Sequence, residues 1–244
     1  MGLRSRHGDD VERKCLRPIV TALKLMSVGV VLSGEMFDSR TDAGDRLGNE
    51  LARRNVEADV VLGIPRGGLP VAKPVADELD VPLSVVVASK IGAPTNPELA
   101  VGAVASDGSV WYNENLVDHL SVSSEYLESE RRTEAEVARE KVDHYRGGAD
   151  LDLDGKRVLV VDDGLATGAT ARACLRQVRE AGAISVVFAV PVASGRSVSE
   201  LERDGVADEI VALDTPRPFG AVGQFYRSFE QVSDEEAMSY LNDR

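Results

Sequence analysis

The 244-residue sequence is poor in the residues that build disulfide frameworks and zinc clusters. It has only two cysteines, Cys15 and Cys174, which are far apart and have no CxxC neighbour. Its three histidines, His7, His119 and His144, are scattered without ligand spacing. These patterns predict neither a disulfide scaffold nor a zinc site, and we expect the histidines to be surface residues.

Long apolar runs and positive charge are also scarce. No apolar run reaches the length that spans a bilayer. Lys and Arg number 28 against 41 Asp and Glu, a net charge of −13, whereas nucleic-acid binding needs a basic face. We therefore expect no membrane partner, no nucleic-acid partner and a cytoplasmic location.

Lysine is the scarcest of the charged residues, with six of the 28 basic positions, while arginine fills the rest. Abundant carboxylates with few lysines are typical of proteins adapted to a high-salt cytoplasm, where salt screens the repulsion between like charges. An ordinary acidic protein is the alternative interpretation.

The hydrophobic content of 43% and the length suffice for one α/β domain, alone or with an appendage. Residues 1–35 combine a stretch of mixed charge with a short apolar run and lack a convincing cleavage site. We interpret them as a non-core N-terminal extension, which an upstream start codon would explain. Residues 36–244 are predicted to form the functional domain.

From residue 41 onward, apolar runs alternate with helical spacings. The predicted strands are 58–64, 83–88, 110–112, 157–161, 184–190 and 209–213. The predicted helices are 41–54, 68–79, 123–145, 169–181, 196–203 and 234–241. Residues 91–108 are rich in Gly, Pro, Ala and Asn, show little periodicity and are predicted as irregular. Alternating β and α elements predict a mostly parallel sheet with helices on both faces.

The most informative stretch is 158–170, which reads Val-Leu-Val-Val-Asp-Asp-Gly-Leu-Ala-Thr-Gly-Ala-Thr. A buried strand ends in Asp162 and Asp163, a loop of small residues follows, and a helix begins at Ala169. Carboxylates accept hydrogen bonds from vicinal hydroxyls, while loop amides and a helix N-terminus bind phosphate. The alternative is an ordinary strand-to-helix turn.

A second loop, residues 64–68, reads Ile-Pro-Arg-Gly-Gly and follows another predicted strand. Its glycines allow backbone amides to approach an anion, and Arg66 adds a fixed charge with bidentate geometry. Ligands of open parallel sheets lie outside the carboxyl ends of the strands, where both loops would meet. Lys90 follows the next strand and could neutralise a leaving anion, and either residues 90–99 or a following hairpin over 103–112 could close over it. The alternative is an ordinary surface loop.

These two loops resemble those of the type I phosphoribosyltransferase family, and the resemblance extends over residues 36–244. It is closest to uncharacterised predicted members. The resemblance implies a twisted, mostly parallel sheet, a small variable hood and a mobile loop in the middle of the chain. It also implies a homodimer that uses phosphoribosyl pyrophosphate (PRPP), Mg²⁺ and a small-molecule acceptor.

The resemblance implies a role for each matched position. Asp162 and Asp163 would bind the ribose hydroxyls and organise Mg²⁺ through water. The positions expected to bind the 5-phosphate are Leu165, Ala166, Thr167, Gly168, Ala169 and Thr170. Those expected to bind pyrophosphate are Arg66, Gly67, Gly68 and Lys90, and in the family the loop that corresponds to residues 64–68 often contains a cis peptide. The catalytic set would be Arg66, Lys90, Asp162 and Asp163.

One position departs from the pattern of the relatives that act on 6-oxopurines. Those enzymes often carry an aspartate directly before the Thr-Gly pair, where this chain has Ala166, so hypoxanthine and guanine are doubtful acceptors. Aromatic residues within 215–226 could stack on a base or belong to the core.

The sequence therefore predicts transfer of a phosphoribosyl group to a nitrogenous acceptor, such as a nucleobase, with release of pyrophosphate. The alternatives are a non-catalytic PRPP-binding regulator and a phosphatase- or kinase-like α/β protein. The last is disfavoured because the chain has no Walker lysine after its glycines and no isolated nucleophilic aspartate at a strand end.

Overall fold

The larger of two sheets is built from short, β-branched apolar strands. The computed structural model describes residues 36–147 and 151–242, and the predicted N-terminal extension lies outside this part. The five strands are all parallel, in the order β2 (Leu83–Val85), β1 (Val60–Gly63), β6 (Arg157–Val161), β7 (Ser185–Val192) and β8 (Glu209–Asp214). Strand β6 lies in the middle, with Leu159 opposite Val61 on one side and Val187 on the other.

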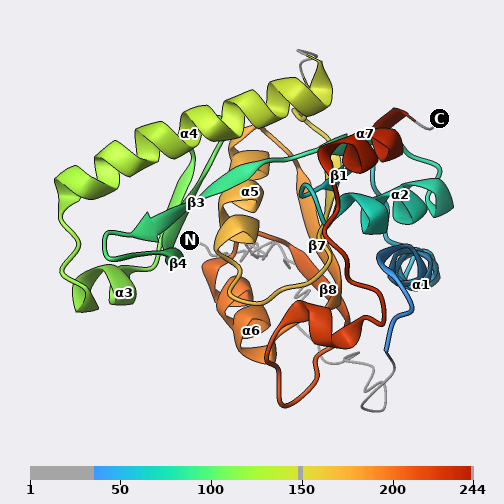
Figure 1. Cartoon of the computed structure of the whole chain (residues 1–244). Coiled ribbons are helices and arrows are strands. Elements are labelled where there is room, and N and C mark those ends of the chain that lie inside the picture. Colours follow the sequence, from blue (N-terminus) through green and yellow to red (C-terminus); the bar gives the residue numbers. More distant parts are fainter. Residues whose placement is uncertain (1–35, 148–150, 243–244) are drawn as a thin grey trace, which may run out of the picture. The chain divides into compact units, whose positions relative to one another are not determined.

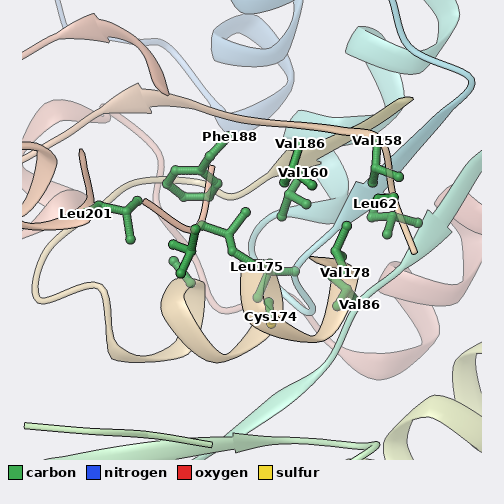
Figure 2. Close-up of a cluster of buried hydrophobic side chains, with 14 of the residues drawn as sticks. Leu62, Val86, Val158, Val160, Cys174, Leu175, Val178, Val186, Phe188 and Leu201 are labelled. Carbon is green, nitrogen blue, oxygen red and sulfur yellow. The ribbon is translucent and has the colours of Figure 1, made fainter. Parts of the chain in front are cut away.

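Alternate side chains of the central strands enter separate cores on the two faces of this sheet. On one face, Val158 and Val160 pack with Phe188 against α5 (Ala169–Glu180), as Figure 2 shows, and α6 (Gly195–Asp204) adds to this cluster. On the other, Leu159 and Val161 pack against α1 (Arg40–Arg53) and α2 (Leu69–Glu78). Helices thus cover both faces, as the sequence predicts.

The second sheet is antiparallel and consists of β3 (Ala88–Ala93), β4 (Asn96–Ala105) and β5 (Val110–Tyr112). The short helix α3 (Glu114–His119) follows, and the 23-residue helix α4 (Ser124–Arg146) packs along this sheet (Figure 1). The expectation of little regular structure over 91–108 is therefore wrong, whereas the hairpin named for 103–112 is confirmed by the antiparallel pairing of β4 with β5. Glycines allow close contacts in these strands: a Cβ on Gly92 would lie 2.6 Å from the Pro97 carbonyl oxygen, and one on Gly102 equally close to that of Trp111.

The segment after β8, residues 215–233, is here called the hood and leads into the C-terminal helix α7 (Asp234–Asn242). The hood contains a 3₁₀ turn at Val222–Phe225 and an aromatic cluster in which Phe37 and Phe229 flank Tyr226, with ring centroids 5.3 and 4.9 Å away. Backbone bonds from Phe37 N to Phe225 O and from Arg227 N to Phe37 O attach the hood to the segment before α1.

Most predicted elements are confirmed, and β6 agrees to the residue. Helix α1 begins earlier than predicted because the Ser39 hydroxyl accepts the Asp42 amide as N-cap, rather than Thr41 or Asp42. The predicted strand 83–88 ends at Val85, and the chain enters the second sheet at Ala88. Helix α3 and the 3₁₀ turn have no counterpart among the predictions. No helix within residues 36–147 and 151–242 has the length and apolarity to cross a membrane.

Candidate functional site

The two predicted anion loops begin at the carboxyl ends of adjacent strands. Strands β1 and β6 pair in register up to Gly63 and Val161, and the Ile64 amide still donates to the Val161 carbonyl at 2.9 Å. We name residues 64–68 the pyrophosphate loop and residues 162–170 the diol–phosphate loop, after the ligands that the sequence leads us to expect. The two loops therefore leave the sheet side by side, as expected.

The two loops approach each other as closely as glycine permits. A Cβ on Gly67 would lie 2.1 Å from Asp163 Oδ2, and one on Gly68 would lie 2.6 Å from the Ile64 carbonyl oxygen and 2.9 Å from that of Val161. Both glycines are thus required by close approach, which explains the Gly-Gly pair physically.

The acid pair at the end of β6 is half-buried and leaves two oxygens open. The Asp163 amide donates to Asp162 Oδ1 at 2.9 Å, and the Tyr226 hydroxyl donates to the Asp163 carbonyl at 2.6 Å. Asp163 Oδ2 accepts a hydrogen bond from Arg40 Nε at 2.8 Å. Within the described residues, Asp162 Oδ2 and Asp163 Oδ1 accept no hydrogen bond, so both remain as acceptors for a ligand.

Burial dominates the electrostatics of this pair. Burial and the neighbouring Asp163 charge raise the pKa of Asp162 well above its usual range, while Arg40 and Lys90 pull it down. Burial also raises the pKa of Asp163, and the hydrogen bond from Arg40 opposes that shift. A ligand that brings hydroxyl donors or a cation would favour the ionised pair.

Arg40 is a site residue that sequence reasoning missed. Its side chain is 12% exposed, its Nη1 donates to the Glu230 carbonyl at 2.7 Å, and its guanidinium lies 3.7 Å from the centre of the Phe229 ring. The first residue of α1 thus connects Asp163 to the hood. Because 123 residues separate Arg40 from Asp163, no local pattern signals the pair.

The phosphate part of the diol–phosphate loop, residues 165–170, presents unpaired amides. No residue of the described chain accepts a hydrogen bond from the backbone amides of residues 166–171. Ala166 and Thr167 are exposed, and Thr170 is half-buried. The side chains of Leu165 and Ala169 are buried in the core, so these two predicted positions offer only backbone groups.

Two side chains hold carbonyls of this loop, and one of them, Ser197, also lines a cavity beside Ala166 and Thr167. Arg172, 2% exposed, donates from Nη1 to the Thr167 carbonyl at 2.8 Å, and the Ser197 hydroxyl donates to the Ala166 carbonyl. Gly168 has φ +78°, and a Cβ there would lie 2.9 Å from Arg172 Nη1. Sequence reasoning missed Arg172 too, although a charged residue within the apolar spacing of α5 was a usable signal.

The pyrophosphate loop is held differently. It has the cis peptide that the resemblance implied, between Pro65 and Arg66. The Arg66 side chain is 37% exposed, and its Nη1 lies 3.5 Å from Asp234 Oδ2 at the start of α7, while Tyr145 of α4 donates to the other oxygen at 2.6 Å. Arg66 and Asp234 line a cavity of about 610 Å³, together with Lys141 and His144.

Lys90 lies on a strand rather than in the predicted loop. It is exposed in β3, opposite Ala103 of β4, and its charge lowers the pKa of Asp162. The second sheet therefore places Lys90 close enough to act on the acid pair electrostatically.

The hood aromatics divide between core and cavity. Tyr226 is buried in the aromatic cluster, whereas Phe219 lines a cavity of about 340 Å³ with Ala166 and Thr167 of the phosphate part of the loop. The same cavity is lined by Asn113 and Arg196. The core interpretation is confirmed for Tyr226, and base stacking by Phe219 stays a prediction.

The chain is similar to curated proteins that are named as phosphoribosyl transferases. The chain is 42% identical over 209 residues to a "putative phosphoribosyl transferase" of Mycobacterium tuberculosis, which covers 85% of the chain and 47% of the relative. It is 28% identical over 148 residues to an amidophosphoribosyltransferase of Mycobacterium bovis, covering 61% of the chain and 21% of that enzyme. The chain thus spans about half the length, or less, of these curated relatives.

A solved structure and a family model also match most of the chain. The crystal structure of TT1426 from Thermus thermophilus has a TM-score of 0.71 and 41% identity, and covers 84% of this chain and 97% of its own. The model of the phosphoribosyl transferase domain matches residues 39–217, which include both loops, Arg172 and Ser197. The chain therefore belongs to the phosphoribosyl transferase family that its two loops resemble.

Proposed function

We propose that this protein transfers the 5-phosphoribosyl group of PRPP to a nitrogenous acceptor and releases pyrophosphate. The observation that carries the proposal is the contact between the two loops, where Gly67 packs directly on the Asp163 carboxylate. Along the site lie the amides of residues 166–171, then the open carboxylate oxygens of the acid pair, then Arg66. A ligand with an anion at each end and a diol between them matches this order.

In the proposed mechanism, the chain acts by orientation and charge rather than by covalent chemistry. Asp162 Oδ2 and Asp163 Oδ1 accept hydrogen bonds from the ribose hydroxyls and stabilise positive charge that develops on the sugar. The amides of the loop and the N-terminus of α5 hold the 5-phosphate. Arg66 and Lys90 stabilise the leaving pyrophosphate.

The residues fit the Mg²⁺ that the resemblance implies. The described residues contain no group of three His, Cys, Asp or Glu that forms a metal cage. Mg²⁺ prefers oxygen ligands and commonly binds through one or two carboxylates, water and substrate phosphates, which suits the open oxygens of Asp162 and Asp163. When bound, the ion would neutralise charge on the leaving pyrophosphate.

Incubation with PRPP, Mg²⁺ and a panel of nucleobases, with pyrophosphate release as the readout, tests the proposal. We expect release with one class of base and little with hypoxanthine or guanine, because Ala166 stands where 6-oxopurine enzymes often carry aspartate. Tight PRPP binding without turnover across a broad panel would instead favour the regulatory alternative.

Asp162→Asn and Asp163→Asn should each abolish PRPP binding in calorimetry, because an amide removes charge and one acceptor from the diol site. Asp45→Asn, an exposed carboxylate on α1, is the matched control and should bind normally. Unchanged binding in the two site variants would overturn the assignment of the ribose site.

Three broader expectations belong to the same proposal. A homodimer predicts twice the chain mass in light scattering. A cytoplasmic location predicts recovery in the cytosolic fraction of the native cells. Adaptation to high salt predicts a melting temperature that rises steadily with molar KCl, because salt screens the repulsion among the 41 acidic residues.

A further inference from the structure

Peptide geometry links the two side chains that hold the loop's carbonyls to the direction of its amides. In a trans peptide, the carbonyl of one residue and the amide N–H of the next point in opposite directions. The described cis peptides lie at Pro65–Arg66 and Arg217–Pro218, so the peptides after Ala166 and Thr167 are trans. The Ala166 and Thr167 carbonyls point toward Ser197 and Arg172, so the next amides, those of Thr167 and Gly168, point away from these two side chains.

We propose that Arg172 and Ser197 are positioning residues for the 5-phosphate: they fix two carbonyls of the loop so that the Thr167 and Gly168 amides face the ligand. This inference rests on the proposed function, since it assigns both residues to the phosphate end of the same site. Neither residue needs to touch the ligand. The ligand group that suits two amide donors side by side is a phosphate monoester dianion.

Arg172 is itself held too firmly to adapt. Its Nε donates to Asp204 Oδ2 at 2.6 Å, its Nη2 to Glu200 Oε2 at 3.3 Å, and its guanidinium lies 4.7 Å from the centre of the Trp111 ring. All three guanidinium nitrogens of Arg172 therefore donate hydrogen bonds, and the one to the Thr167 carbonyl is held in direction by the other two. Lysine keeps the charge but cannot reproduce this three-way geometry.

Ser197 adds an independent support from another helix. It is 5% exposed in the first turn of α6, and its hydroxyl reaches across 31 residues of sequence to the Ala166 carbonyl. The Ser194 amide donates to the Leu165 carbonyl at 2.8 Å, so α6 and the residue before it hold two successive carbonyls of the loop. The loop is thus fixed from α5 and α6 together.

The test compares Ser197→Ala and Arg172→Lys with controls on the same two helices. Ser199→Ala removes a hydroxyl that donates only to the Gly195 carbonyl within α6. Arg176→Gln removes a guanidinium of α5 that donates to the Val110 carbonyl at 2.8 Å, away from the loop. Titration calorimetry then measures the binding of ribose 5-phosphate and, separately, of pyrophosphate with Mg²⁺.

We expect ribose 5-phosphate to bind roughly tenfold more weakly to Ser197→Ala, the scale of a lost hydrogen bond between neutral groups. For Arg172→Lys we expect a loss of roughly thirtyfold, the scale of a lost charge-assisted hydrogen bond. Pyrophosphate binding should stay unchanged in both, which a general loosening of the protein would not produce. The two controls should bind both ligands as the unmodified protein does. In turnover, the KM for PRPP should rise while kcat changes little.

Equal affinity for ribose 5-phosphate in folded Ser197→Ala and in Ser199→Ala would overturn the inference, even if Arg172→Lys fails to fold. Parallel losses of ribose 5-phosphate and pyrophosphate binding would also overturn it. Failure of the proposed function gives a different result, because the unmodified protein would then bind neither PRPP nor ribose 5-phosphate.

Discussion

The two loops at the ends of β1 and β6 lie side by side, but they are held in opposite ways. The diol–phosphate loop is held by side chains from α1, α5, α6 and the hood. The pyrophosphate loop depends on close packing of glycine backbone and carries one half-exposed arginine, paired with Asp234 of α7. The diol–phosphate loop is thus fixed by buried hydrogen bonds, while Arg66 of the pyrophosphate loop is paired only at the surface, with Asp234.

This difference matches the proposed chemistry. The 5-phosphate stays attached to the sugar from substrate to product, so a fixed cradle costs nothing during turnover. Pyrophosphate must leave, and a half-exposed Arg66 that already has an alternative partner can release it.

Gly67→Ala should have the largest effect, because its methyl would lie 2.1 Å from Asp163 Oδ2 and must push the two loops apart. We expect PRPP affinity to fall by about a hundredfold or more, the upper range for overpacking. Gly195→Ala is the control, since its methyl meets nothing closer than Arg217 Nη2 at 3.7 Å. Normal PRPP binding by Gly67→Ala in calorimetry would show that the loops move apart freely.

Arg40→Gln should weaken PRPP binding by roughly tenfold, because Asp163 loses its charged partner and the hood loses a contact to α1. Arg53→Gln, on the same helix and paired at the surface with Glu50, should leave binding unchanged. Equal PRPP affinities of the two variants would show that Arg40 does not contribute to PRPP binding.

Asp162→Asn should raise the melting temperature at neutral pH while PRPP binding is lost. The pKa of Asp162 is raised in the folded protein, so folding favours its protonated form. That stabilisation is complete below about pH 4, near the unfolded pKa, and disappears as pH rises through the folded pKa. The advantage of the amide should therefore grow with pH from about 4 upward, and a gain that is independent of pH would contradict the assignment.

Asp234→Asn should have the smallest effect, because its ion pair with Arg66 is exposed. With the competing carboxylate gone, we expect pyrophosphate to inhibit turnover about twofold more strongly, while ribose 5-phosphate binding stays the same. The control is Asp77→Asn, which removes another exposed partner, that of Lys73. Weaker pyrophosphate inhibition would show that Asp234 orients Arg66 rather than competing for it.

Features with local causes were predictable from the sequence. The run of valines before Asp162 fixes β6, and small residues followed by helical spacing place the phosphate part of the loop and α5. Both loops meet as expected, because parallel order alone brings their strand ends to one edge.

The features that failed depend on partners far away in the chain. Strands β3 and β4 contain Gly92, Pro97 and Gly102, which are residue types that disfavour strands. These strands form because they pair with each other and because α4 packs on them. Arg40 and Ser197 show no local signal, because each becomes a site residue only when tertiary folding brings it to the loop.

The stacking of Arg172 on Trp111 has a practical consequence. Trp111 is the only tryptophan of the chain, and it lies 4.7 Å from the cation that holds the Thr167 carbonyl. Its indole emission is therefore an intrinsic optical probe of Arg172 and of the loop proposed to bind the 5-phosphate, free of background from other tryptophans. A stopped-flow trace of that emission would time the arrival of ribose 5-phosphate without any label.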